Sequence, residues 1–111
     1  MKESVILVNS QFLGKGDDIL GEGLLETFFT LLKQTNDLPE AVFFVNSGVL
    51  ALTERSLASL HIKELEDKGV SILACKTCIN YYEIEHQLIS GQVSSMKQFI
   101  ELASKFRVIT L

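Results

Sequence analysis

The chain has 111 residues, 47% of them hydrophobic, and its 14 acidic residues outnumber its 10 basic ones, which gives a formal net charge of −4. This length fits one domain, residues 1–111, and so few scattered basic residues exclude a nucleic-acid-binding patch. No apolar stretch approaches the roughly 20 residues of a membrane-spanning helix, and the opening residues, MKESVILVNS, predict a first strand and not a signal peptide.

Four short apolar runs predict strands in chain order. They are VILV (5–8), AVFFV (41–45), VSILA (70–74) and VITL (108–111). These runs are rich in Val, Ile and Phe and mostly do not alternate with polar residues, which is typical of parallel strands buried on both faces. Their starts lie about thirty to forty residues apart, the length of a βαβ unit. A short extra strand is expected around Val93.

The intervals between these runs predict helices. They span residues 17–33, 51–68 with a break near 56–59, 77–90 and 95–105. Asp17 or Asp18 is placed to cap the first helix, and Ser95 followed by Gln98 has the form of a capping box at the last one. The alternation of strands and helices predicts an α/β fold with three layers, α/β/α, around a mainly parallel sheet.

Polar residues follow three of the predicted strands directly. Asn9 follows the first strand, Asn46 and Ser47 follow the second, and Cys75-Lys76-Thr77-Cys78 follows the third. In open parallel sheets, binding sites form at the carboxyl ends of the strands, so we expect these residues to line one rim. The alternative is that Asn and Ser are simply ordinary loop residues here.

A glycine-rich stretch after the first strand does not satisfy either common phosphate-binding motif. The dinucleotide motif GxGxxG fails because Ile19 stands where its last glycine belongs, and the P-loop motif fails because Gly21 is followed by Glu22. Asp17 and Asp18 at the predicted helix start would also repel a phosphate. We therefore expect no nucleotide and no other cofactor.

The two cysteines of the chain form a CxxC motif. If Thr77 caps the third helix, Cys78 lies in its first turn and Cys75 lies at the strand end. The positive end of the helix and the neighbouring Lys76 then favour the thiolate form. This arrangement suits a nucleophile that carries sulfur as a persulfide, or one that cycles through a disulfide.

Three other interpretations of the cysteines stay open. Cysteine is among the most buried residue types, so Cys75 and Cys78 can be core residues. A zinc site would need His61 or His86 as further ligands, and the spacing to His86 matches no standard site, so no metal is expected. A thioredoxin-type redox role fits the CxxC motif, but the rest of the chain does not match the sequence of thioredoxin. Two cysteines without a secretory signal predict a reducing, cytoplasmic location.

The chain resembles the DsrE/DsrF-like sulfur-relay family, and within it the C-terminal domain of the YedF proteins. Those proteins are associated with selenium metabolism and are called sulfurtransferase-like. The similarity runs nearly end to end and is carried by LGKGDDILG, FVNSGVLALTE and ILACKTCINYY. It implies an α/β/α fold with a sheet of about five strands and a tendency to form homo-oligomers, which the mean hydropathy of +0.27 also favours.

The resemblance also implies which residues carry the chemistry. Relay members hold persulfide sulfur on a cysteine at the end of the third core strand, and Cys75 matches that position, with Cys78 as a second cysteine. Lys76 departs from the family pattern, which usually has glycine there. YedF-type proteins also carry an N-terminal domain like the small TusA sulfur carriers, and nothing here resembles it. A sulfur-carrier protein or a TusA-like domain is therefore the expected donor or acceptor.

Together these observations predict a cytoplasmic, sulfurtransferase-like carrier that accepts persulfide sulfur, or selenium, on Cys75 with Cys78 assisting. The alternatives are a non-catalytic binding module that uses the same rim and a thiol-disulfide redox domain. The expected supporting residues are Lys76, Thr77, Asn9, Asn46 and Ser47.

Overall fold

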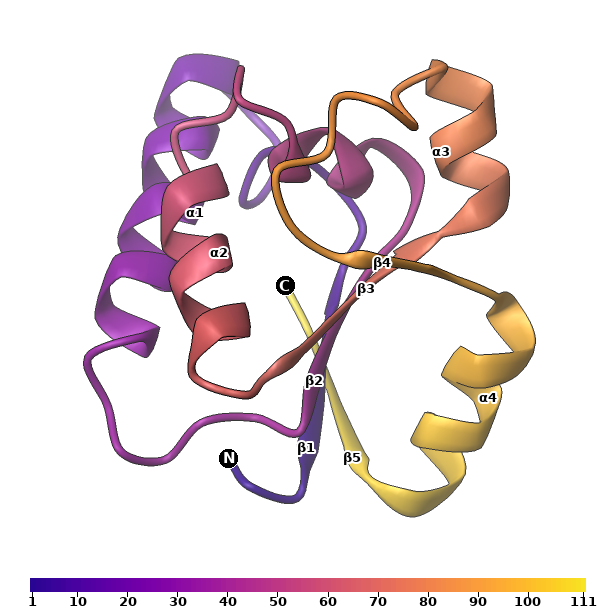
Figure 1. Ribbon diagram of the computed structural model, residues 1–111. Coiled ribbons are helices and arrows are strands. Elements are labelled where there is room, and N and C mark those ends of the chain that lie inside the picture. The colour runs from indigo at the N-terminus through magenta and orange to yellow at the C-terminus, as the bar shows by residue number, and fades with distance from the viewer.

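Five strands form one fully parallel sheet with helices on both faces in a computed structural model of residues 1–111 (Figure 1). The strands are β1 (Ser4–Val8), β2 (Ala41–Phe44), β3 (Ser71–Cys75), β4 (Gln92–Ser94) and β5 (Arg107–Thr110). Their spatial order is β4-β3-β2-β1-β5, so the chain moves outward from β1 to β4 and then returns to place β5 on the other side of β1. The predicted fold class and the short strand at Val93 are confirmed.

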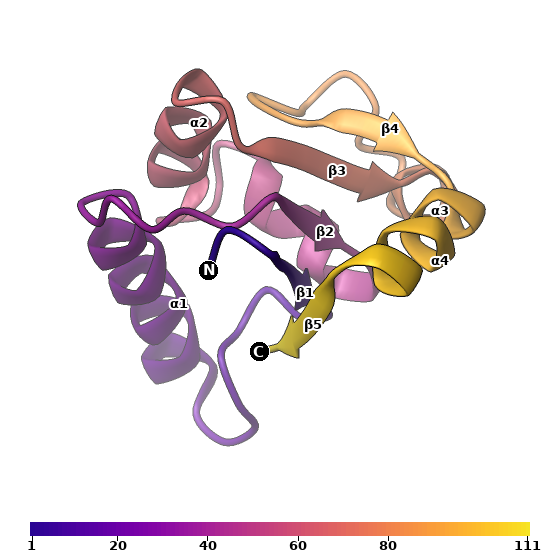
Figure 2. The same ribbon diagram turned by 90° about the horizontal axis from the view of Figure 1, so that it is seen from below.

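Four α-helices and one 3-10 helix connect these strands. They are α1 (Asp18–Leu32), the 3-10 helix η1 (Asn46–Leu52), α2 (Ser59–Asp67), α3 (Lys76–Tyr82) and α4 (Met96–Lys105). Helices α1 and α2 lie side by side on one face of the sheet, and α4 lies on the other (Figures 1 and 2). Helix α3 packs against η1 and the end of β3. None of these helices has the length and apolar character needed to cross a membrane.

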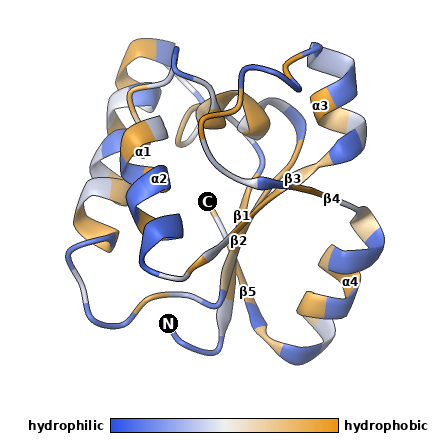
Figure 3. Cartoon of the chain, viewed as in Figure 1, coloured by the Kyte–Doolittle hydropathy of each residue, from blue (hydrophilic) through white to orange (hydrophobic).

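The inner strands β1, β2 and β3 are mostly hydrophobic because both faces of the sheet are covered there (Figure 3). The edge strands β4 and β5 also carry exposed polar residues, such as Gln92 and Arg107. Alternate residues such as Ile6 and Phe44 enter the larger core under α1 and α2. Their neighbours Val5 and Phe43 enter a smaller core that also contains Cys75 and packs against α4. No residue of α4 is fully buried, so this second face has the thinner cover.

Side chains cap α1 and α4 as the sequence predicts. The Asp17 carboxylate accepts a hydrogen bond from the Leu20 N–H at 2.9 Å, and the Ser95 hydroxyl accepts one from the Gln98 N–H at 3.1 Å. The Gln98 side chain meets the hydroxyl of Ser94 instead of returning to Ser95. Only half of the predicted capping box therefore forms.

The predicted helix over residues 77–90 is wrong in its length. Helix α3 ends at Tyr82 because Glu83 adopts the left-handed conformation (φ 54°), which turns the chain back. Ile84 is then buried in the core, and its N–H donates to the Ile79 carbonyl at 3.2 Å. The chain continues as turns, with Leu88 bridged to the segment after η1. The gain from burying Ile84 outweighs the helical turns that the local sequence favours.

The break predicted near residues 56–59 is confirmed, since α2 begins only at Ser59. The part before the break is not α-helical: residues 51–52 end the 3-10 helix η1, and the residues that follow form an isolated bridge and turns.

Candidate functional site

Strand β3 passes directly into α3 at the two cysteines. Cys75 is the last residue of β3 and the N-cap of α3, and Cys78 lies in the first turn of the helix. Both are free thiols, and Cys78 packs against the small core cluster that contains Cys75. Cys75 is 6% exposed and packs in the core under α4, whereas Cys78 is partly exposed.

The prediction that Thr77 caps α3 is wrong. No side chain caps this helix, and Thr77 lies within its first turn. The reason is that no linker residue separates β3 from α3, so the cap position falls on Cys75. Thr77 is exposed and lies beside Cys78 in a pocket described below.

A backbone group from a distant segment contacts the second thiol. The N–H of Asn46, at the start of η1, donates to the Cys78 Sγ at 3.0 Å. Asn46 has a positive φ of 51°, a left-handed conformation that asparagine tolerates better than most residues. Two residues later, a Cβ added to Gly48 would lie 2.3 Å from the Val8 carbonyl oxygen. This close approach of η1 to the end of β1 fixes the position of the Asn46 N–H.

The surroundings of Cys78 favour its neutral form. Burial raises the pKa of the Cys78 thiol, and the neighbouring Cys75 side chain raises it further. The Asn46 N–H lowers the pKa, but by less than burial raises it. Lys76 is exposed and forms no ion pair with any carboxylate. The prediction that the helix start and Lys76 make this thiol acidic is therefore wrong for Cys78.

A pocket of about 400 Å³ lies beside Cys78. Its lining residues are Asn46, Thr77, Cys78, Tyr81 and Tyr82. The two tyrosine rings meet edge to face with their centroids 5.1 Å apart, and Tyr81 is 79% exposed. Cys75 does not line this pocket. A reagent or partner that approaches from the pocket therefore reaches the sulfur of Cys78 first.

A second pocket, of about 430 Å³, adjoins the first through Asn46 and lies at the ends of β1 and β5. The strand order reverses at this point, where open α/β sheets tend to bind ligands. Asn9 and Lys15 line it, so Asn9 lies at the expected edge of the sheet but not in the cysteine pocket. Ser47 uses its hydroxyl to accept the Gln11 N–H at 3.4 Å. Of Asn9, Asn46 and Ser47, only Asn46 forms a hydrogen bond with a cysteine.

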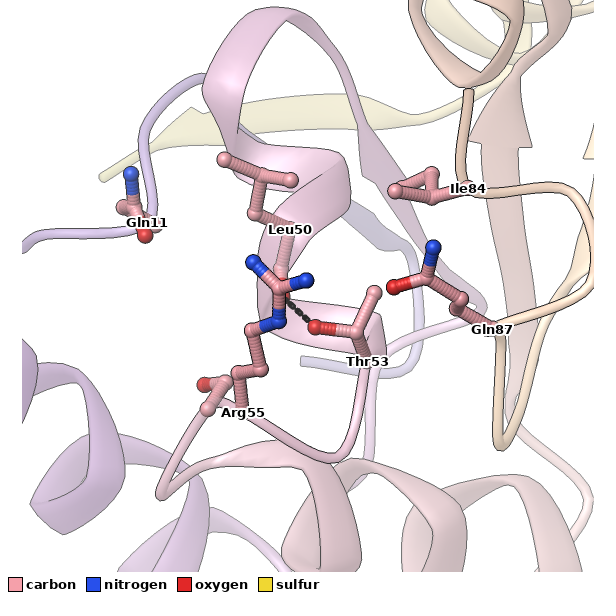
Figure 4. A pocket seen from close by; sticks show the side chains of 7 residues that line it. Gln11, Leu50, Thr53, Arg55, Ile84 and Gln87 are labelled. Carbon is pink, nitrogen blue, oxygen red and sulfur yellow. Dashed lines mark hydrogen bonds between the residues drawn. The ribbon is translucent and has the colours of Figure 1, made fainter. Parts of the chain in front are cut away.

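A third, smaller cavity of about 90 Å³ was not foreseen from the sequence (Figure 4). Arg55, one of only two arginines in the chain, lines it together with Thr53 and Gln87. The Thr53 hydroxyl donates to the Leu50 carbonyl at 2.8 Å, and no carboxylate lines the cavity, so its lining suits an anion better than a cation. Gln87 reaches it only because residues 84–90 are not helical. The cavity shares no lining residue with the cysteine pocket.

The histidines do not join the cysteines in a metal-binding cluster. No group of three or more His, Cys, Asp or Glu side chains lies close enough together to hold a metal ion. His61 lies in α2, with its Nε2 3.5 Å from the carboxylate of Glu26 in α1, and His86 is exposed in the turns after α3.

Comparisons with known proteins find one matching family model and solved structures of similar fold. The model of the DsrE/DsrF-like family matches residues 25–111, a span that includes both cysteines and the Asn46 segment. Two solved structures superimpose over 100% of this chain and of their own chains, each at 17% identity. They are the ychN protein from E. coli (TM-score 0.74) and MTH1491 from Methanobacterium thermoautotrophicum (TM-score 0.70), a protein of unknown function. At this identity they show the shared fold alone. No curated protein matches the chain.

Proposed function

The chain belongs to the DsrE/DsrF-like family, which is associated with sulfur relay, and on that premise we propose that it carries sulfur as a persulfide on its cysteine pair. The observation that supports this function is the pair of neighbouring free thiols at the carboxyl edge of the sheet, one of them beside an open pocket. Persulfide carriage needs such a thiol, because only a sulfur that a donor can reach can accept a sulfur atom.

Access favours Cys78 as the accepting thiol. The family resemblance pointed to Cys75 by its position after the third strand, but Cys75 is 6% exposed and does not line the pocket. In the proposed reaction, the Cys78 thiolate attacks the outer sulfur of a donor persulfide, and the donor leaves as a thiol. The Asn46 N–H would stabilise the negative charge on the Cys78 sulfur. Cys75 would support Cys78 as its neighbouring thiol.

The partners follow from the same proposal. A sulfur-carrier protein or a TusA-like domain is the proposed donor or acceptor, and selenium is the alternative cargo if the likeness to YedF proteins holds. The exposed ring of Tyr81 beside the pocket offers such a partner an apolar contact. We also propose a cytoplasmic location and a homo-oligomer, in which a second copy covers the exposed side chains of Met96 and Ile100 on the thinly covered α4 face.

Intact-protein mass spectrometry tests the proposed function. The protein is incubated with a cysteine desulfurase and cysteine, and samples are quenched at short times with an alkylating agent. We expect a reductant-sensitive gain of about 32 Da, one sulfur atom, in the wild type and in Cys75→Ala but not in Cys78→Ser. Loading of Cys78→Ser together with loss of loading in Cys75→Ala would return the assignment to Cys75.

A binding module without turnover is the second candidate, and the raised pKa of the Cys78 thiol favours it because a neutral thiol attacks poorly. No sulfur gain in any variant, with thiols that also resist alkylation in the folded protein, would support this candidate. Partner binding that survives replacement of both cysteines by serine would then identify the rim itself as the functional surface.

A further inference from the structure

Cys75 has an unusual combination of properties for a residue next to an accepting thiol. It lies one helical turn from Cys78, which packs against the same small core cluster, yet Cys75 itself is 6% exposed and is buried in that cluster with Leu73 and Phe43 under α4. A bulky donor cannot reach it through the pocket, whose lining contains Cys78 alone of the two. Cys75 can therefore react only with Cys78 or with a group bound to Cys78.

We propose that Cys75 is a resolving thiol, which attacks the persulfide on Cys78, releases sulfide and closes a disulfide between Cys75 and Cys78. This inference rests on the proposed function, since it begins from the loaded Cys78. It adds a second outcome to the relay: besides passing its sulfur to an acceptor, the protein reduces that sulfur to sulfide by itself.

The atoms and electrons of the step balance without another reactant. The Sγ of Cys75 attacks the Sγ of Cys78, and the bond between that Sγ and the outer sulfur breaks. The electron pair of the broken bond leaves with the outer sulfur, which takes up the proton lost by Cys75 and departs as hydrogen sulfide. The outer sulfur is reduced, and the two cysteine sulfurs are oxidised to a disulfide. A dithiol reductant is then needed to reopen the disulfide before the next cycle.

The geometry directs the attack to the inner sulfur. Cys75 lies on the core side of Cys78, whose Sγ is the inner sulfur of a persulfide formed there. The outer sulfur of that persulfide would extend from Cys78 toward the pocket, away from the core that holds Cys75. Attack at the inner sulfur yields sulfide, whereas attack at the outer sulfur would only move the persulfide from one cysteine to the other. The CxxC spacing at a helix start is also the spacing of disulfide-forming redox motifs.

Because Cys75 is buried, it attacks only after Cys78 has been loaded. Free thiols and donors meet Cys78 first, so Cys75 stays reduced until Cys78 is loaded. Closure then competes with outward transfer to an acceptor at the pocket. An acceptor bound there would draw the sulfur onward, and in its absence the sulfur would leave as sulfide.

The experiment follows the sulfur after loading. Wild type and Cys75→Ala are loaded with a cysteine desulfurase and cysteine, separated from the reagents, and monitored with a sulfide-selective probe and by intact mass. We expect the wild type to release its sulfur as sulfide and to end about 2 Da below the reduced mass, the loss of two hydrogens. We expect Cys75→Ala to keep its persulfide, with sulfide release at least about tenfold slower. Cys75→Ser repeats the comparison in case the alanine variant folds poorly.

Each outcome separates the two proposals. A wild type that loads but holds its persulfide as long as Cys75→Ala, with no internal disulfide, overturns the resolving role and leaves the carrier function standing. A disulfide that joins two chains, seen as a reductant-sensitive dimer, also overturns the resolving role. Failure of the wild type and of both variants to load overturns the carrier function and, with it, this inference.

Discussion

The Asn46 N–H donates to the Cys78 Sγ at 3.0 Å and so joins the segment after β2 to the first turn of α3. The two residues are 32 positions apart in the chain. Their contact depends on the left-handed conformation of Asn46, which points its N–H toward the helix start. Changes at this turn are therefore expected to alter the reactivity of the thiol as well as the stability of the fold.

The tight turn at Gly48 gives the first prediction. In Gly48→Ala, the new Cβ would lie 2.3 Å from the Val8 carbonyl oxygen, so η1 must move away from β1. We expect a loss of about 1–3 kcal/mol in the free energy of unfolding, the usual cost of overpacking, together with a changed alkylation rate of Cys78. Urea denaturation and timed alkylation measure the two effects. Gly23→Ala is the matched control, since open space surrounds that position in α1, and it should stabilise the protein by about 0.5–1 kcal/mol.

The second prediction concerns the conformation of Asn46 itself. A β-branched side chain is strained at a φ of 51°, so Asn46→Val should lower the free energy of unfolding by about 1–2 kcal/mol. Asn46→Gly adopts this conformation without strain and keeps the N–H, so it should alkylate at Cys78 much as the wild type does. Equal stability of the valine and glycine variants would contradict this account of the turn.

The third prediction follows from the raised pKa of the Cys78 thiol. Its alkylation should be slow at neutral pH and should accelerate up to a pKa above the ordinary cysteine value. Because the pKa is higher in the folded than in the unfolded chain, the folded state holds its proton more tightly. The protonated thiol therefore contributes its whole stabilisation at a pH below the pKa of the unfolded chain. This contribution is lost as the pH rises through the pKa of the folded chain. Urea denaturation between neutral and alkaline pH should therefore show a larger loss of stability in wild type than in Cys78→Ser.

The fourth prediction tests the proposed homo-oligomer. Ile100 on α4 is 63% exposed on the thinly covered face of the sheet. If a second copy covers it, Ile100→Glu should shift the protein to a smaller species in analytical ultracentrifugation. Leu31→Glu is the matched control, because Leu31 is 58% exposed but lies on α1, on the opposite face. Dissociation by the Leu31 variant alone would move the interface to the α1 face.

The fifth prediction tests the cap of α1. The Asp17 carboxylate is the only side chain that accepts a hydrogen bond from a backbone N–H at this helix start. Asp17→Ala should therefore lower the free energy of unfolding by about 0.5–2 kcal/mol. Asp18→Ala removes a charge from the same turn but no hydrogen bond, and its cost should be smaller. Thermal denaturation of the two variants compares them. A larger effect at position 18 would show that charge, and not the cap, sets the stability of this end.

The fold was predictable because its signals are local. The composition of runs such as residues 5–8 and 41–45 indicates burial on both faces. Asp17 and Ser95 are residue types that favour the first position of a helix. The length of α3 was not predictable in the same way. Its end depends on the burial of Ile84 against segments distant in the sequence, which local helix propensity does not record.

The sequence predicts where the cysteines of the candidate site lie in the fold, but not what surrounds each of them. The sequence places both cysteines at a strand end, but it does not say that Cys75 faces the core under α4 while Cys78 faces a pocket. The contact with Asn46 is likewise long-range. The raised pKa of the Cys78 thiol depends mainly on this burial, which follows from contacts distant in the sequence.

The direct passage of β3 into α3 has a consequence for how fast the two thiols can react with each other. Because Cys75 ends the strand and begins the helix, no flexible loop separates it from Cys78. The two sulfurs are held together by the same backbone that forms the sheet and the first helical turn. Little chain entropy is then lost when they meet, and each thiol faces the other at a high effective molarity. Intramolecular chemistry at this pair has a kinetic advantage over any dissolved thiol, whatever the donor or acceptor proves to be.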